Sequence, residues 1–372
     1  MIRLASVIDT FESAFLAQYR ERLRPEHTQA LAAIKHCRSQ ASPKMQLACS
    51  QCDHQSLVPH SCGHRHCPHC QHYESQRWLE RQLAKQVPAH YFLITFTLPA
   101  ELRPLAWAHQ RLVYDLLMRC AWETLRTFAH NDRQLRGIAG AIAVLHTNTR
   151  EHEFHPHVHV VMPAAALDAN TKRWRTKRPG KTKAGYLFNQ KALAKVFRAK
   201  MLAGIEAAGL ALPQRYARQW VVDCKSVGSG QPALIYLGRY LYRGVIREKD
   251  ILACDNDQVR YRFRNAKTGQ FEQRSLPGAD FLWLILQHVL PKGFRRARNF
   301  GFLHPNCKRL IALLQVVLKL DRAPISRWIK PRAPILCTCC GASMTIVRTR
   351  IRTTQPIRIT IPIPTEENAM IG

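Results

Sequence analysis

The chain has 372 residues, of which 46% are hydrophobic, so its composition excludes a disordered protein and allows two or three domains. Lys and Arg number 56 against 25 Asp and Glu, giving a formal net charge of +31. This excess predicts a polyanionic partner, and its spread along the whole chain favours nucleic acid over a membrane surface. No apolar run approaches the roughly 20 residues of a spanning helix, and the N-terminus lacks the apolar core of a signal peptide. We therefore expect a cytoplasmic, nucleoid-associated protein without membrane partners.

The first 36 residues are predicted to form two helices, because Val7, Phe11, Phe15 and Tyr19 recur at helical spacing. A helix is also expected over residues 73–85. Between these helices, residues 37–72 are rich in Cys and His and poor in aliphatic side chains, as expected of a segment held together by metal.

Two Cys-x-x-Cys pairs, fourteen residues apart, lie within this segment. This is the form of a four-cysteine zinc ribbon or knuckle, in which each pair presents two thiolates to one ion. A closed set of four ligands is structural, so we predict a structural Zn²⁺ in a DNA-recognition module. The predicted ligands are Cys49, Cys52, Cys67 and Cys70. Cys62 or His66 could replace one of them, and Cys37 is a further candidate.

The next part of the chain alternates strands and helices. The β-branched and aromatic run at 91–98 predicts a central strand, and a long helix is expected over 105–129. Strands at 138–149 and 156–162 follow, joined by a turn at 150–154. This order predicts a mixed α+β fold with a central antiparallel sheet flanked by helices.

His157 and His159 lie on the last of these strands, where alternate side chains share a face. Two imidazoles on one face form half of a metal site, although a His-rich surface turn is the plainer interpretation. If residues 150–154 form the hairpin loop, His146 lies opposite and is the best third ligand. An open site with nitrogen and oxygen ligands favours Mg²⁺ or Mn²⁺ and phosphoryl chemistry. Other candidates for the third ligand lie at the turn: Glu151, Glu153 and His155.

A tyrosine-containing helix is predicted about eighty residues further on, after a flexible segment at 228–232. Tyr236 and Tyr240 are one helical turn apart, flanked by Arg239 and Arg243, which we expect to contact DNA. An amphipathic helix with tyrosine as core filler is the alternative. A phenol can attack a phosphodiester and store its energy as a phosphotyrosine ester, provided that a metal and cations assist.

The basic segment 170–185 contains Trp174 among cations that include Lys172 and Arg173. It could stack a base of single-stranded DNA, or be a solvated loop. Residues 180–182 match the end of a P-loop, but Arg175 stands where its first glycine belongs. We therefore expect no ATP-dependent activity.

The C-terminal third is predicted to contain a hairpin at 259–276 and helices at 281–290 and 305–320. Cys337, Cys339 and Cys340 form half of a possible metal site, and no second pair follows. The half-site is either the remnant of a ribbon or a loop that requires a partner.

Several of these motifs, in this order, resemble the two-tyrosine HUH rolling-circle transposases of the insertion-sequence ninety-one group. The resemblance covers about residues 25–310. The matching segments are Ser61 to Gln71 (zinc region), Tyr91 to Pro99 (first strand), His155 to His159 (HUH motif), Tyr236 to Tyr240 (paired tyrosines) and His288 to Arg296 (C-terminal signature).

The resemblance implies an HUH endonuclease fold and a metal-dependent enzyme that cuts and rejoins single-stranded DNA at the ends of a bacterial mobile element. It gives Tyr236 and Tyr240 the role of nucleophiles, and His157 and His159 that of metal ligands. A plasmid or phage replication initiator or relaxase is the alternative enzyme, and a zinc-ribbon DNA-binding regulator the non-enzymatic one. The expected domains are a zinc module (1–87), a nuclease domain (88–250), a hairpin and helical region (251–335) and a basic tail (336–372).

Overall fold

The structure of the protein is a computed structural model that describes residues 1–168, 170–171, 173–178, 185–242, 244–319 and 333–351. The chain divides into two compact units: a larger one of residues 1–35 and 63–331, and a smaller one of residues 36–62 and 332–372. The smaller unit thus joins an N-terminal segment to the end of the chain. The predicted boundaries at residues 87, 250 and 335 differ from this division.

The larger unit is built on a seven-stranded sheet with the order β7-β6-β4-β5-β3-β8, and β12 pairs with β4. Neighbouring strands are antiparallel. The mixed α+β fold with a central antiparallel sheet is therefore confirmed. The strands are β3 (Tyr91–Thr97), β4 (Ile138–Asn148), β5 (Phe154–Pro163), β6 (Ala165–Leu167), β7 (Trp174–Thr176), β8 (Val222–Ser226) and β12 (Ala297–Gly301).

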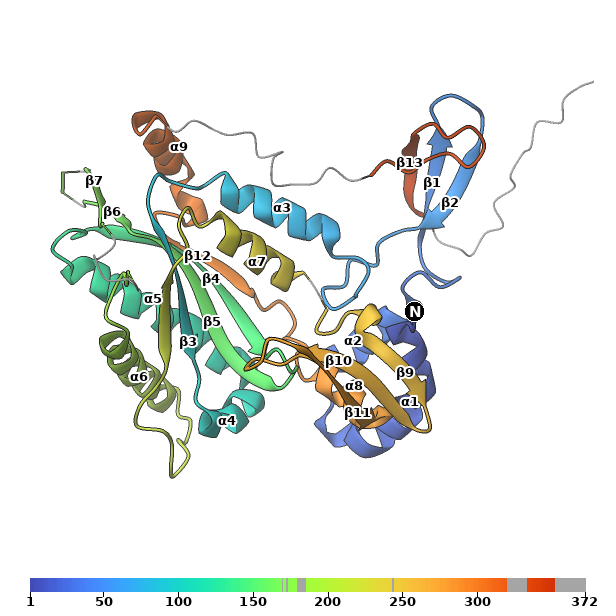
Figure 1. The fold of residues 1–372 in the computed structure, drawn as a ribbon, viewed down its shortest axis with the longest axis horizontal. Coiled ribbons are helices and arrows are strands. Elements are labelled where there is room, and N and C mark those ends of the chain that lie inside the picture. Colours follow the sequence, from blue (N-terminus) through green and yellow to red (C-terminus); the bar gives the residue numbers. More distant parts are fainter. Residues whose placement is uncertain (169, 172, 179–184, 243, 320–332, 352–372) are drawn as a thin grey trace, which may run out of the picture. The chain divides into compact units, whose positions relative to one another are not determined.

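Helices cover both faces of this sheet (Figure 1). One face packs against α4 (Arg103–Ala108), α5 (Gln110–Asn131) and α6 (Gln190–Ala207). The other packs against α3 (His72–Leu83) and α7 (Gln231–Leu241). The helix predicted over 105–129 is broken at His109, whose backbone leaves the helical region (φ −121°, ψ 48°), which ends α4 and starts α5.

Two local signals fix helix starts beside the sheet. The Asn189 side chain accepts a hydrogen bond from the backbone N–H of Ala192, at 3.0 Å, and so caps the start of α6. Gly230 precedes α7 with φ +79°, and a Cβ there would lie 2.6 Å from Cγ of Tyr91. Only glycine fits this turn, which places α7 against the strands.

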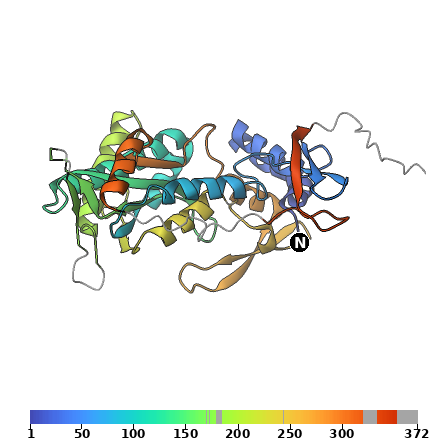
Figure 2. The same ribbon diagram turned by 90° about the horizontal axis from the view of Figure 1, so that it is seen from above.

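A second hydrophobic cluster in the larger unit brings its first two helices together with segments from its C-terminal part. Helices α1 (Leu4–Tyr19) and α2 (Pro25–His36) share a hydrophobic core with α8 (Gly278–Leu286) and a three-stranded sheet. That sheet comprises β9 (Ile251–Asp255), β10 (Gln258–Arg264) and β11 (Phe271–Pro277). The predicted hairpin is β10–β11, and Figure 2 shows it projecting, in orange-yellow, from the helices of its cluster. After β12, the chain forms α9 (Lys308–Val317).

The smaller unit contains a three-stranded antiparallel sheet with the order β13-β1-β2. Its strands are β1 (Lys44–Cys49), β2 (Gln55–Pro59) and β13 (Met344–Ile351). Across the residues that the structure describes, no helix is long and apolar enough to cross a membrane.

Candidate active site

Three histidines meet on the face of the sheet that α7 covers. In the β4–β5 register His146 lies opposite His157, and Val144 lies opposite His159. The hairpin thus brings all three imidazoles to one place, and each offers a ring nitrogen within 4.8 Å of the others. The bulge between His146 and Asn148 leaves this arrangement intact.

Hydrogen bonds orient the imidazoles. The Thr95 hydroxyl, on β3, lies 2.9 Å from Nδ1 of His159, and Nδ1 of His157 lies 2.7 Å from the backbone oxygen of His155. Nε2 of both rings is therefore left to face the cluster. In the described part of the chain, the buried Nε2 of His146 has no hydrogen-bond partner. An unsatisfied buried nitrogen beside two free ones is the arrangement that a metal ion would complete.

Burial keeps these imidazoles neutral. It lowers the pKa of His157 to about 3 and that of His159 to about 4, and it lowers the pKa of His146 well below its ordinary value. Repulsion from His159 adds to the effect on both His146 and His157. Only a neutral imidazole can ligate a metal ion, so the electrostatics agree with the geometry.

Tyr236 projects from α7 above the histidines and is 51% exposed. Its ring centroid lies 6.2 Å from those of His146 and His159. Burial of its inner part raises the pKa of Tyr236, and Tyr240 raises it further, whereas Arg150 opposes the shift. The phenol is therefore protonated at neutral pH and would need activation to act as a nucleophile.

Tyr240 lies one turn further along α7 and is held on every side. Its ring stacks on that of His146 with centroids 3.3 Å apart. The guanidinium of Arg296, the residue before β12, lies 4.5 Å from the Tyr240 ring centroid. Its hydroxyl donates to Oδ1 of Asn148 and accepts from the backbone N–H of Thr147, at 3.4 Å. The sequence did not single out Asn148, Thr95 or Arg296, because each meets its partner only when distant elements pack together: Thr95 across the β3–β5 pair, and Asn148 and Arg296 against Tyr240 of α7.

A cavity of about 650 Å³ opens over the histidines and tyrosines. Among its described lining residues, Asp250 is the one acidic group, and it is paired with Arg247 and Arg262. The exposed ring of Phe271, on the β10–β11 hairpin, also lines it. The cavity is therefore positive, and the hairpin contributes to it, which the sequence had not indicated. Its arginines are Arg150, Arg247, Arg262, Arg264 and Arg296.

The residues predicted to contact DNA lie in different surroundings. Arg239 is exposed on α7, and Arg173 is exposed beside β7. Lys172 and Arg243 lie outside the described residues, as do residues 180–182 of the P-loop-like string. Trp174 is part of β7, within the segment expected to be a loop, and its ring packs edge-on against Phe302 at 5.5 Å. The ring is half-buried and packs against the edge of the hydrophobic core, and its role as a platform for a base stays a prediction.

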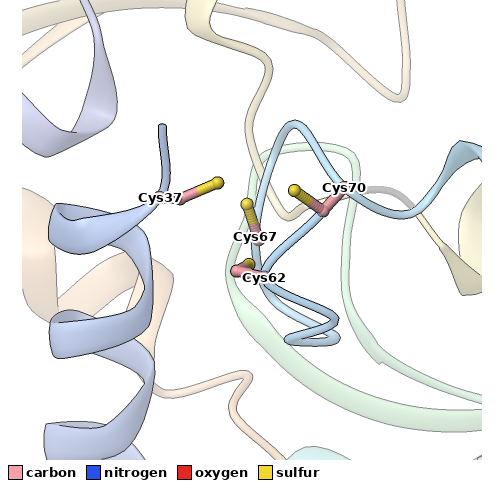
Figure 3. A group of neighbouring side chains, drawn as sticks. All are labelled: Cys37, Cys62, Cys67 and Cys70. Atoms are coloured by element: carbon pink, nitrogen blue, oxygen red, sulfur yellow. The ribbon is translucent and has the colours of Figure 1, made fainter. Parts of the chain in front are cut away.

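The cysteines form two groups instead of the predicted single set. Cys67 and Cys70 lie with Cys37 and Cys62, as Figure 3 shows. Cys49 and Cys52 lie with Cys337 and Cys340. In each group all four sulfur atoms lie within 4.8 Å of one another, so the structure offers two four-thiolate sets where the spacing predicted one. The error arose because sequence spacing cannot reveal which distant pairs meet.

Comparison with known proteins agrees with this geometry. The profile of a family described as putative transposase matches residues 140–310, which include the three histidines and both tyrosines. A second family, described as the transposase zinc-binding domain, matches residues 7–98. This match and the two cysteine groups support structural zinc in the protein.

Relatives match over most of their length. A putative transposase, y4qJ, of Sinorhizobium fredii is 33% identical over 316 residues, covering 77% of this chain and 78% of the relative. The transposase for insertion sequence element IS801 of Pseudomonas savastanoi pv. phaseolicola is 28% identical, covering 79% of this chain and 76% of the relative. The solved conjugative relaxase TrwC in complex with oriT DNA is 14% identical with a TM-score of 0.25, covering 62% of this chain and 72% of its own. On the strength of the two family matches and the two transposase relatives, the chain belongs to the insertion-sequence ninety-one group of rolling-circle transposases, with that group's zinc-binding domain in its N-terminal part.

Proposed function

We propose that this transposase cuts and rejoins single-stranded DNA through a covalent phosphotyrosine intermediate at the site formed by β4, β5 and α7. The observation that carries the proposal is the position of Tyr236 and Tyr240 over three neutral imidazoles within one positive cavity. A nucleophile, a metal-binding group and cations for the phosphate are the parts that this chemistry needs.

In the cutting step, a tyrosine oxygen attacks the scissile phosphorus and loses its proton. The bond from phosphorus to the 3′ oxygen breaks, and that oxygen leaves as a 3′-hydroxyl group after taking up a proton. The DNA then remains joined to the protein by a 5′-phosphotyrosine ester. Attack of another 3′-hydroxyl on this ester reverses the step, so the joining reaction needs no ATP.

A divalent ion held by His146, His157 and His159 would polarise the scissile phosphate and stabilise its developing charge. Imidazole nitrogens are softer ligands than the carboxylates that Mg²⁺ usually takes. Of the two ions expected from the sequence, three imidazoles therefore favour Mn²⁺ over Mg²⁺. Thr95 and the backbone oxygen of His155 hold two of the rings in the orientation that ligation requires.

The cavity suits a flexible single strand. Its arginines can neutralise successive phosphates, and the Phe271 ring beside the Arg262 guanidinium, 5.2 Å from the ring centroid, can stack an unpaired base. Paired bases in a duplex would not present their faces to this ring. The cavity therefore favours single-stranded DNA as the substrate.

The test is incubation of the full chain with labelled single strands from the ends of its element, with Mn²⁺ or Mg²⁺. We expect a covalent protein–DNA adduct that survives denaturation and is lost in EDTA. The double variant Tyr236→Phe, Tyr240→Phe should form no adduct yet bind the strand nearly as tightly, because only the phenol oxygens are removed. Tyr242→Phe serves as the matched control. Adduct formation by the double variant, or full activity in chelator, would refute the proposal.

A further inference from the structure

The C-terminal cysteines, which the sequence left without partners, meet the N-terminal hairpin inside the smaller unit. Cys337 and Cys340 lie against Cys49 and Cys52, nearly three hundred residues earlier in the chain. All four belong to this unit, and the zinc-binding-domain match at residues 7–98 includes only the first pair. The second half of this cluster is therefore not covered by the family match.

The distances between the sulfur atoms fit one tetrahedral ion. Cys340 Sγ lies 3.4 Å from Cys49 Sγ and 3.6 Å from Cys52 Sγ, and the Sγ atoms of Cys52 and Cys337 are 3.8 Å apart. Zinc–sulfur bonds of about 2.3 Å at tetrahedral angles place sulfur atoms about 3.8 Å apart. A disulfide requires about 2.05 Å, and all four cysteines are free thiols.

The backbone repeats the same turn at both pairs. In the first, the Cys49 N–H donates to the His54 oxygen at 2.9 Å, and the Gln51 N–H points at Cys49 Sγ, at 3.4 Å. The second pair copies both contacts at the same offsets. The Cys337 N–H donates to the Ala342 oxygen at 2.7 Å, and the Cys339 N–H points at Cys337 Sγ, at 3.4 Å. N–H groups aimed at sulfur favour the thiolate form, which is the form that binds metal.

We propose that Cys49, Cys52, Cys337 and Cys340 bind a second structural zinc ion, which fastens the C-terminal strand β13 to the N-terminal strands β1 and β2. The ion completes a zinc ribbon whose two halves come from opposite ends of the sequence. It is separate from any ion at Cys37, Cys62, Cys67 and Cys70, and independent of the nuclease chemistry.

The smaller unit needs such an ion because its described core is small. In β1, Met45 and Leu47 are buried, but Ile346 and Val347 of β13 are 51% and 57% exposed. A sheet with so little buried apolar surface gains little from packing alone. Metal ligation contributes folding free energy directly in domains of this kind, so the pairing of β13 with β1 should depend on the ion.

The experiment counts zinc bound to the full chain by native mass spectrometry, comparing wild type with Cys337→Ser, Cys340→Ser. We expect the double variant to hold one zinc ion fewer per chain. Cys339→Ser is the matched control, because Cys339 is exposed in the same turn and outside the cluster, and it should hold as many ions as wild type. The comparison measures a difference, so zinc bound at the histidines affects all variants equally.

Cadmium substitution provides a second readout. The ¹¹³Cd spectrum of wild type should contain two signals from all-sulfur sites, of which the double variant loses one and retains the other. The retained signal also shows that the rest of the chain has folded. Equal zinc counts in wild type and the double variant, or all-sulfur ¹¹³Cd signals that are the same in both, would overturn the proposal. So would a Cys49–Cys340 disulfide in wild type purified without reductant.

Discussion

The rings of His146 and Tyr240 lie face to face, with centroids 3.3 Å apart and 10° between their planes. The Tyr240 hydroxyl donates to Oδ1 of Asn148 and accepts from the backbone N–H of Thr147, so both of its hydrogen-bonding roles are already taken within the protein. Tyr236 is half exposed, and within the described chain no hydrogen bond engages its hydroxyl. The two tyrosines are therefore unequal, although the sequence presents them as a pair.

We predict that Tyr236 makes the first cut. With a single-stranded oligonucleotide that contains one cleavage site, Tyr236→Phe should abolish the covalent adduct. Tyr240→Phe should keep the rate of adduct formation within about tenfold of wild type, a change of about 1.4 kcal/mol in activation free energy. Gel analysis of the denatured adduct measures both. Loss of the adduct in Tyr240→Phe with its retention in Tyr236→Phe would reverse the order.

The part of the site that depends on local periodicity could be predicted from the sequence. Alternation along β5 puts His157 and His159 on one face, and a short hairpin puts His146 opposite them. Helical spacing likewise puts Tyr236 and Tyr240 on one side of α7. Such relationships span a few residues or one tight turn, so their geometry follows from the rise and period of a strand or helix.

Contacts that close long loops could not be predicted. Cys337 could have met any other pair of cysteines, and the spacing of 49, 52, 67 and 70 pointed to the wrong set. The sequence presents Trp174 as an exposed residue among cations, but its ring is half-buried and contacts Phe302, far along the chain, edge-on. In both cases the partner is chosen by the tertiary packing of distant segments, which leaves no periodic signal.

A second prediction concerns the orientation of the metal ligands. Thr95→Val removes the hydroxyl group that lies 2.9 Å from Nδ1 of His159 and keeps the shape of the side chain. The ring is then free to turn, so we expect Mn²⁺ to bind about 10- to 100-fold more weakly. Thr97→Val, two residues along the same strand face, is the control and should bind Mn²⁺ normally. Titration with Mn²⁺, followed by calorimetry, measures both variants; equal affinities would show that Thr95 does not position the ligand.

The β10–β11 hairpin provides a third prediction. If Phe271 stacks a base, Phe271→Ala should weaken binding of a single strand by about 1–3 kcal/mol, or roughly 5- to 150-fold. Leu252→Ala is the control, because Leu252 is 38% exposed on the neighbouring strand β9 and does not line the cavity. Fluorescence anisotropy at fixed salt measures the affinity. If both variants bind like wild type, the strand does not pass over this hairpin.

The last prediction concerns acid stability and His27, which is buried on α2 between the rings of Trp107 and Trp283. Its Nδ1 accepts a hydrogen bond from the backbone N–H of Arg24, at 3.1 Å, which only the neutral ring can do. Burial, with the nearby Arg24 charge, lowers its pKa to about 4. In the unfolded chain the pKa of His27 has its ordinary value of about 6.5. As the pH falls from 6.5 towards 4, His27 therefore takes up a proton in the unfolded chain before it does so in the folded one.

Keeping His27 neutral should thus contribute on the order of 2–3 kcal/mol to the free energy of unfolding. This contribution should be fully present above pH 6.5 and be lost progressively between pH 6.5 and 4. His27→Gln should be less stable at neutral pH, because packing against the two tryptophans is lost, but its unfolding free energy should fall less steeply with acid. His130→Gln is the control, because His130 is exposed at the end of α5 and should leave the slope unchanged. Urea unfolding at several pH values, at constant zinc, gives the slopes. Parallel slopes for wild type and His27→Gln would show that His27 does not titrate on unfolding, and would remove it as a source of the acid sensitivity.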